Sequence, residues 1–79
     1  MNAQDKCLSA WRRCHDAAYR LPLGADHCKT AAFYAWLRAA TRFARAASWA
    51  ESREEFQSYL REAAYSVREA KRGALCGTY

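Results

Sequence analysis

Apolar residues recur every three or four positions along the start of the chain. One stripe is formed by Cys7, Trp11, Cys14, Ala18 and Leu21. Charged side chains take the opposite face, at Lys6, Arg13, Asp16 and Arg20. This is the pattern of an amphipathic helix, and it predicts one over residues 3–20 with Asn2 as its N-cap.

A second helix is predicted over residues 26–47. Pro22 and Gly24 break the chain before it, and Asp26 is a suitable N-cap. Residues spaced at 100° per position place a wide apolar sector around Trp36 and Phe43, with many alanines and with Phe33 and Leu37 at its edge. A face this broad is typical of a central helix.

Neither glycine nor proline interrupts residues 25–72, so one long helix has to be weighed against two. A third stripe consists of Phe56, Leu60, Ala63, Val67 and Ala70. In a continuous helix it would lie about 150° away from the stripe of Trp36 and Phe43. A break near residues 48–52 lets both stripes share one core, and Ser48–Glu51 or Ser52–Glu55 would supply a capping box. The alternative is an extended helix that pairs with another chain.

The third helix is predicted over residues 52–72. Its first turns contain glutamates and its last turn contains basic residues, which is the arrangement that the helix dipole favours. Gly73 is expected to end the helix. Residues 74–79 would then form a short C-terminal tail. The predicted fold is an all-α, compact antiparallel three-helix bundle that forms a single domain over residues 1–79.

The positive charge is concentrated in the first two thirds of the chain. The net charge is +5, and residues 50–79 hold five basic and five acidic residues, so the excess lies in residues 1–49. Ten of the thirteen basic residues are arginine, whose planar fork suits carboxylates and phosphates. We therefore expect an acidic protein surface, a nucleoprotein complex or nucleic acid as partner. The alternative is that arginine and alanine are simply abundant in a GC-rich genome.

One exposed edge of the second helix is the best candidate for a binding site. Tyr34, Arg38, Arg42 and Arg45, here called the arginine strip, are spaced by four, four and three positions. Arginine and tyrosine are enriched at interface hot spots. Residues of the first helix could extend the strip: Arg12, Arg13, Tyr19 and Arg20. Tyr65 is a further exposed candidate, whereas Trp11, Trp36 and Trp49 are interpreted as core or hinge packing. The alternative is that the arginines only keep an alanine-rich helix soluble.

Four cysteines and two histidines allow three interpretations. Cys7, Cys14 and Cys28 could be small buried hydrophobic residues, as free cysteine commonly is. A Cys14–Cys28 disulfide could close the first hairpin in an oxidising compartment. A structural zinc ion could be held by Cys14, Cys28 and Cys76 with His27 or His15, since the bundle brings these positions to one end. The short ligand spacings of known zinc motifs are absent from the sequence.

Signatures of catalysis and of membrane insertion are absent from the sequence. It has no glycine-rich phosphate loop, no Gly-x-Ser-x-Gly and no His-Glu-x-x-His motif, so we expect neither an enzyme nor a cofactor. Basic residues interrupt every apolar run before the ~20 residues that a membrane span needs. The chain starts with a polar segment instead of a secretory signal, which predicts a cytoplasmic protein.

In size and helical character, the chain resembles the very small proteins of phages and mobile elements that dock on larger machines. That resemblance implies a non-enzymatic inhibitor or regulator of a nucleic-acid-handling complex, such as an anti-CRISPR-like protein. Direct nucleic-acid binding through arginine-rich helix faces is the first alternative. A zinc-stapled or redox-sensing helical module is the second. The sequence leaves open whether the protein is a monomer or a dimer.

Overall fold

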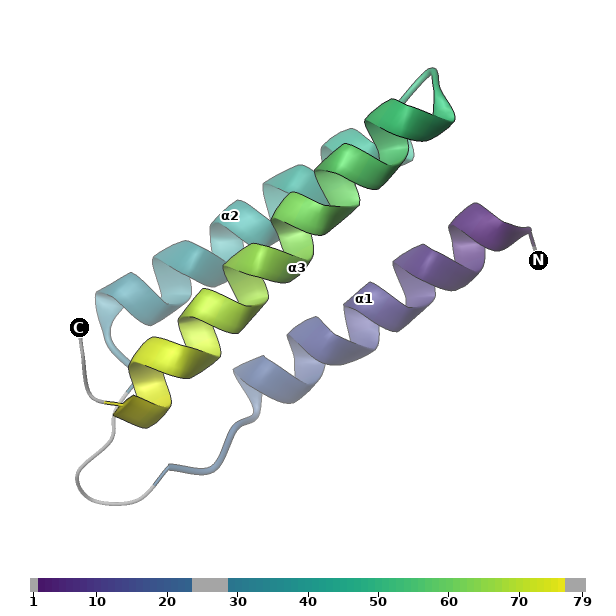
Figure 1. The fold of residues 1–79 in the computed structure, drawn as a ribbon. Helices are drawn as coiled ribbons and strands as arrows, with labels where there is room; N and C mark the ends of the chain where they lie inside the picture. Colours follow the sequence, from purple (N-terminus) through teal and green to yellow (C-terminus); the bar gives the residue numbers. More distant parts are fainter. Residues whose placement is uncertain (1, 24–28, 77–79) are drawn as a thin grey trace.

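Three helices make up the protein, in a computed structural model that describes residues 2–23 and 29–76. They are α1 (Ala3–Tyr19), α2 (Ala31–Ser48) and α3 (Arg53–Cys76), and the described residues include no strand. Each helix runs antiparallel to the one before it (Figure 1). The predicted all-α three-helix bundle is therefore confirmed.

Short polar side chains cap all three helices. The Asp5 N–H donates to Asn2 Oδ1 at 2.8 Å, which confirms Asn2 as the N-cap of α1. The Glu55 N–H donates to Ser52 Oγ at 3.1 Å at the start of α3. At α2 the cap is Thr30, and the helix begins five residues later than predicted. The expected cap Asp26 lies outside the described residues.

The turn at residues 49–52 separates α2 from α3. α2 ends at Ser48, and the Trp49 and Ala50 N–H groups donate to the carbonyls of its last turn at 3.1 Å. The break is therefore confirmed where the phase of the apolar stripes predicted it. One continuous helix over both segments is wrong, because only the reversal lets both apolar faces be buried together.

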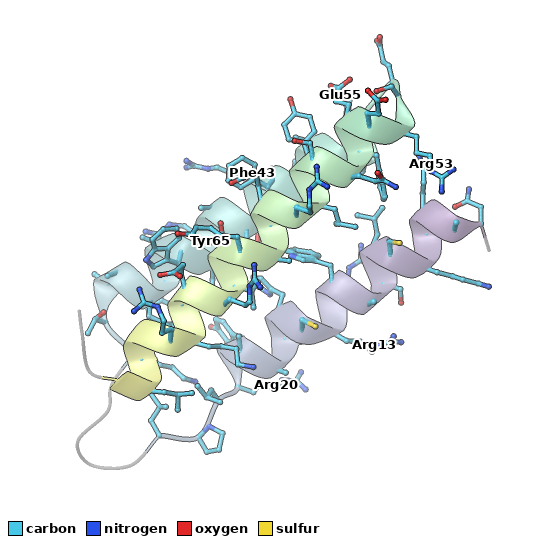
Figure 2. All side chains as sticks on the ribbon, viewed as in Figure 1. Arg13, Arg20, Phe43, Arg53, Glu55 and Tyr65 are labelled. Carbon is cyan, nitrogen blue, oxygen red and sulfur yellow. The ribbon has the colours of Figure 1, made fainter. Side chains whose placement is uncertain are left out.

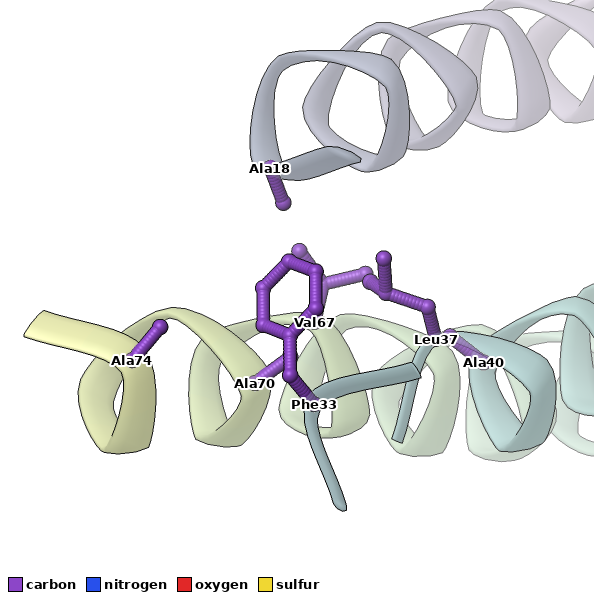
Figure 3. Close-up of a cluster of buried hydrophobic side chains, with 7 residues drawn as sticks. All are labelled: Ala18, Phe33, Leu37, Ala40, Val67, Ala70 and Ala74. Atoms are coloured by element: carbon purple, nitrogen blue, oxygen red, sulfur yellow. The ribbon is translucent and has the colours of Figure 1, made fainter. Parts of the chain in front are cut away.

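Alanine dominates the interior of the bundle. The main cluster consists of Ala18, Phe33, Leu37, Ala40, Val67, Ala70 and Ala74. In Figure 3, Ala18 of α1 faces the side chains of Phe33, Leu37 and Val67. Of the side chains that the structure describes, Phe33 is the largest that is fully buried.

The buried face of α2 is rotated from the predicted one. Trp36 and Phe43, the expected centre, are only half-buried, whereas Phe33 and Leu37, expected at the edge, are buried. α2 meets α3 along the small side chains of Ala40, Ala44 and Ala47. Small residues let two helix backbones approach closely, so the large rings of Trp36 and Phe43 lie on the flank.

Gly73 does not end α3, and the prediction that it does is wrong. The helix continues to Cys76, so residues 74–76 of the expected tail are helical. Gly73 and Ala74 are both buried, and Ala74 extends the stripe of Ala63, Val67 and Ala70. Burial of this extra turn offsets the roughly 1 kcal/mol that a glycine costs inside a helix.

α1 is attached mainly through its C-terminal half. Ala18 is the residue of α1 that is fully buried, and Thr41 Oγ1 lies 3.4 Å from His15 Nε2. The Lys29 ammonium donates a hydrogen bond to the Tyr19 carbonyl at the end of α1. Residues 2–7 are all exposed. α1 is therefore the outlying helix of the bundle, beside a tight α2–α3 hairpin (Figure 1).

Candidate functional site

The arginine strip lies on the solvent-facing side of α2. Arg38, Arg42 and Arg45 are exposed, and Tyr34 is 36% exposed. The opposite side of the same helix is buried in the core, through Phe33, Leu37, Ala40 and Ala44. The strip is thus displayed by a helix that the core holds in place.

Trp49 continues the strip beyond the end of α2. It follows Arg45 by four positions, and it is 80% exposed. Arg42, Arg45, Ala46 and Trp49 line a shallow hollow of about 330 Å³. The interpretation of Trp49 as a packed residue is therefore wrong, and the spacing of four after Arg45 was the signal that could have placed it on the strip.

The three arginines of the strip are not neutralised by carboxylates within the described part of the chain. α2 contains no acidic residue. Among the described residues, Arg72 forms an ion pair with Glu69 at 2.6 Å and His15 Nδ1 lies 3.8 Å from Asp16 Oδ1, and neither contact includes an arginine of the strip. Arg38, Arg42 and Arg45 therefore present uncompensated positive charge between two aromatic rings.

Tyr19 joins α1 to the tyrosine end of the strip. The rings of Tyr19 and Tyr34 meet edge to face with centroids 6.0 Å apart, and Tyr19 is 55% exposed. The Lys29 ammonium lies 5.9 Å from the centroid of the Tyr19 ring. These contacts add an aromatic ring and a further cation at this end of the surface.

The remaining candidate residues are exposed but not all are brought to the strip. Figure 2 shows Arg13 and Arg20 on the outer side of α1, away from α2. Arg12 is on the same flank of α1 as Tyr19, seven positions earlier. Tyr65 is 46% exposed on α3 and meets Trp36 edge to face at 6.1 Å. Arg12 alone of these four lies on the flank that leads to the strip.

The cysteines do not behave as the sequence led us to expect. Cys7 and Cys14 are exposed on α1, so their interpretation as buried hydrophobic residues is wrong. Their side of α1 faces an open groove instead of a closed core. His27 and Cys28 lie outside the described residues, as does the side chain of Cys76. The zinc site and the Cys14–Cys28 disulfide stay predictions, and the described residues contain no group of three metal ligands.

One carboxyl group on α3 has a shifted pKa. A side-chain hydrogen bond from Arg72 lowers the pKa of Glu69, and the positive charges of Arg72 and Arg68 act in the same direction. Arg72 Nη2 and Nε lie 2.6 and 3.3 Å from Glu69 Oε2. This ion pair lies on the surface of α3 and includes no residue of the arginine strip.

None of the helices in the described part of the chain is apolar over a length that could cross a bilayer. The chain matches no protein-family model, no curated protein and no solved structure with which it was compared.

Proposed function

We propose that the protein is a non-enzymatic interaction protein that docks on an acidic surface of a larger partner and inhibits or regulates it. The arginine strip and Trp49 make the contact, and the α2–α3 hairpin holds them in a fixed geometry. A cytoplasmic nucleic-acid-handling complex is the proposed partner, as for inhibitors encoded by phages and mobile elements.

The observation that carries this proposal is a run of three arginines that have no carboxylate partner among the described residues and lie between two exposed aromatic rings. Tryptophan, tyrosine and arginine are the residue types that contribute most to binding at protein interfaces. Tyr34 and Trp49 stand at the two ends of the strip, about 22 Å apart along the helix at 1.5 Å per residue. That length suits a protein surface better than a small ligand.

Direct binding of nucleic acid is the second candidate function. An exposed tryptophan beside arginines is also the combination that stacks on bases and contacts phosphates in single-stranded nucleic acid. Trp49 beside Arg42 and Arg45 is the observation that favours it.

Charge reversal of the strip tests the docking proposal. The triple variant Arg38→Glu, Arg42→Glu and Arg45→Glu should abolish capture of the partner, with an unchanged far-UV circular dichroism spectrum. The control, Arg13→Glu with Arg20→Glu, reverses two exposed arginines on the other side of α1 and should capture the partner normally. A photo-crosslinker at Trp49 should join the same partner. Retention of the partner by the triple variant would show that the strip is only a solvated face.

Titration with salt separates the two candidate functions. If the three arginines contact phosphates of duplex DNA, affinity should fall about 40-fold between 50 and 200 mM salt. Gel-shift measurements with generic duplex and single strands check this. Absence of any shift at 50 mM salt removes the nucleic-acid function and leaves protein docking.

A further inference from the structure

A groove of about 960 Å³ runs between α1 and α3, on a different part of the surface from the arginine strip. It exists because α1 is held at its C-terminal half while its N-terminal half stands exposed beside α3. The volume is at the upper end of the range for ligand sites in proteins.

Apolar and small side chains form the floor of this groove. From α3 come Phe56, Leu60, Ala64 and Val67, and from α1 come Cys7, Ala10, Trp11 and Cys14. The α3 residues are spaced by four, four and three positions, which gives one continuous face about 17 Å long. The Trp11 Nε1–H is buried and has no hydrogen-bond acceptor among the described residues. The packing between α1 and α3 is thus incomplete at this position.

The rim of the groove is basic. Four cations line it, at Arg53, Arg61, Arg68 and Lys71, and none of its lining residues is acidic. Three glutamates of the same helix, Glu55, Glu62 and Glu69, are spaced by seven and lie roughly 140° around α3 from these cations. In Figure 2, Arg53 is on the α1 side of α3 and Glu55 is on its other side. The fourth glutamate, Glu54, lies only about 20° from Arg61 around the helix, but none of the four lines the groove, so the side of α3 that borders it is mainly positive.

We propose that this groove binds an acidic amphipathic helix of a partner protein. The apolar face of that helix covers Leu60, Ala64 and Trp11, and its carboxylates pair with the basic residues on the rim. Apolar residues at i, i+3, i+4 and i+7 would match the floor, as in other complexes where a helix fills a groove. The bound helix completes a four-helix arrangement from three.

Binding of a designed peptide tests this proposal on the full chain. The peptide has about 14 residues, which span about 21 Å as a helix, with leucines on one face and glutamates beside them. A scrambled peptide of the same composition is the control. We expect saturable binding of the designed peptide by fluorescence anisotropy and at least about tenfold weaker binding of the scrambled one. Equal affinities for the two peptides overturn the proposal, because charge alone would then explain binding.

Charge reversal at the rim shows where the peptide binds. Arg61→Glu with Arg68→Glu removes two ion pairs and adds repulsion, so affinity should fall at least about tenfold. Both residues are exposed, so the fold is kept. Arg13→Glu with Arg20→Glu is the matched control for net charge, and Arg38→Glu with Arg42→Glu is the control for the arginine strip. An equal loss in all three double variants overturns the proposal.

The two exposed thiols in the groove report its occupancy directly. Peptide at about ten times its Kd should slow alkylation of Cys7 and Cys14 about tenfold, because about a tenth of the sites remain free. Mass spectrometry of proteolytic fragments follows each cysteine separately. Unchanged alkylation in the presence of the peptide overturns the proposal. If the peptide does not bind and oleate vesicles protect the two thiols instead, the groove binds lipid and the proposal is also overturned. Protection that grows with protein concentration alone also overturns it, since the occupant is then a second copy of this chain.

Discussion

Replacement of Phe33 tests whether the buried face of α2 is placed correctly. The pattern of the sequence centres that face on Trp36 and Phe43, whereas the structure buries Phe33 completely and leaves Phe43 half-buried. The two placements predict opposite orders of stability for Phe33→Ala and Phe43→Ala. The comparison of the two stability losses therefore tests which face of α2 is buried, and not only whether the protein has a core.

The expected loss at Phe33 is large for a protein of this size. A phenylalanine buries about 150–250 Å², which at about 25 cal/mol per Å² corresponds to roughly 4–6 kcal/mol. Measured Phe→Ala substitutions in cores cost about 3–5 kcal/mol. A chain of 79 residues has a free energy of unfolding of about 4–12 kcal/mol. Phe33→Ala should therefore remove about a quarter or more of the stability, and Phe43→Ala about 1–2 kcal/mol.

Urea unfolding followed by circular dichroism provides the measurement. Phe33→Leu, with an expected loss of about 1 kcal/mol, keeps the experiment readable if Phe33→Ala does not fold. Trp49→Ala is the surface control, and its effect should stay within about 0.5 kcal/mol. If Phe43→Ala costs more than Phe33→Ala, or Phe33→Leu costs nothing, then α2 is rotated toward the face that the sequence pattern favoured.

Two further predictions concern the caps and charges of α3. Ser52→Ala removes the acceptor of the Glu55 N–H and should cost about 1 kcal/mol in urea unfolding, whereas Ser48→Ala, which leaves every N-cap intact, should cost less. A larger loss at Ser48 would contradict the capping assignment. The pKa of Glu69 is lowered in the folded state from about 4.5, so its pair with Arg72 stabilises the fold above that pH, and this contribution is lost as pH falls through the lowered pKa. Glu69→Gln should flatten the dependence of stability on pH below 4.5, and an unchanged profile would contradict it.

The reversal between α2 and α3 was predictable because it depends on the angular positions of the apolar residues around the helix axis, and these positions follow from their spacing in the sequence. Two apolar stripes that are out of register in one helix must be folded onto each other to be buried. The caps Asn2 and Ser52 were predictable for the same kind of reason, since a capping side chain bonds to a backbone group three residues away. Local rules of this kind need no knowledge of the other helices.

The rotation of α2 and the end of α3 depend on neighbours that the sequence pattern does not identify. A hydrophobicity pattern weights Trp36 and Phe43 by their size, but close packing of two helices selects the alanines between them. Glycine has a low helix propensity, so Gly73 is expected to end the helix. Packing against the other helices outweighs this cost and stabilises the continuation of α3 beyond Gly73. The exposed thiols have the same origin, because a stripe on α1 predicts an apolar face but not whether another helix closes over it.

The distribution of aromatic residues connects this fold to binding. Among the residues that the structure describes, seven of the eleven buried hydrophobic ones are alanines, while Tyr19, Tyr34, Trp49 and Tyr65 are each at least 36% exposed. An alanine buries little apolar area, so a small chain that places its large rings outside gives up stabilisation that the same rings would supply inside. A single exposed aromatic residue is ordinary, but here Tyr34 and Trp49 stand at the two ends of one row of exposed arginines. Burial of these rings against a partner would recover that stabilisation, so binding at the arginine strip should raise the unfolding temperature of this protein by mass action.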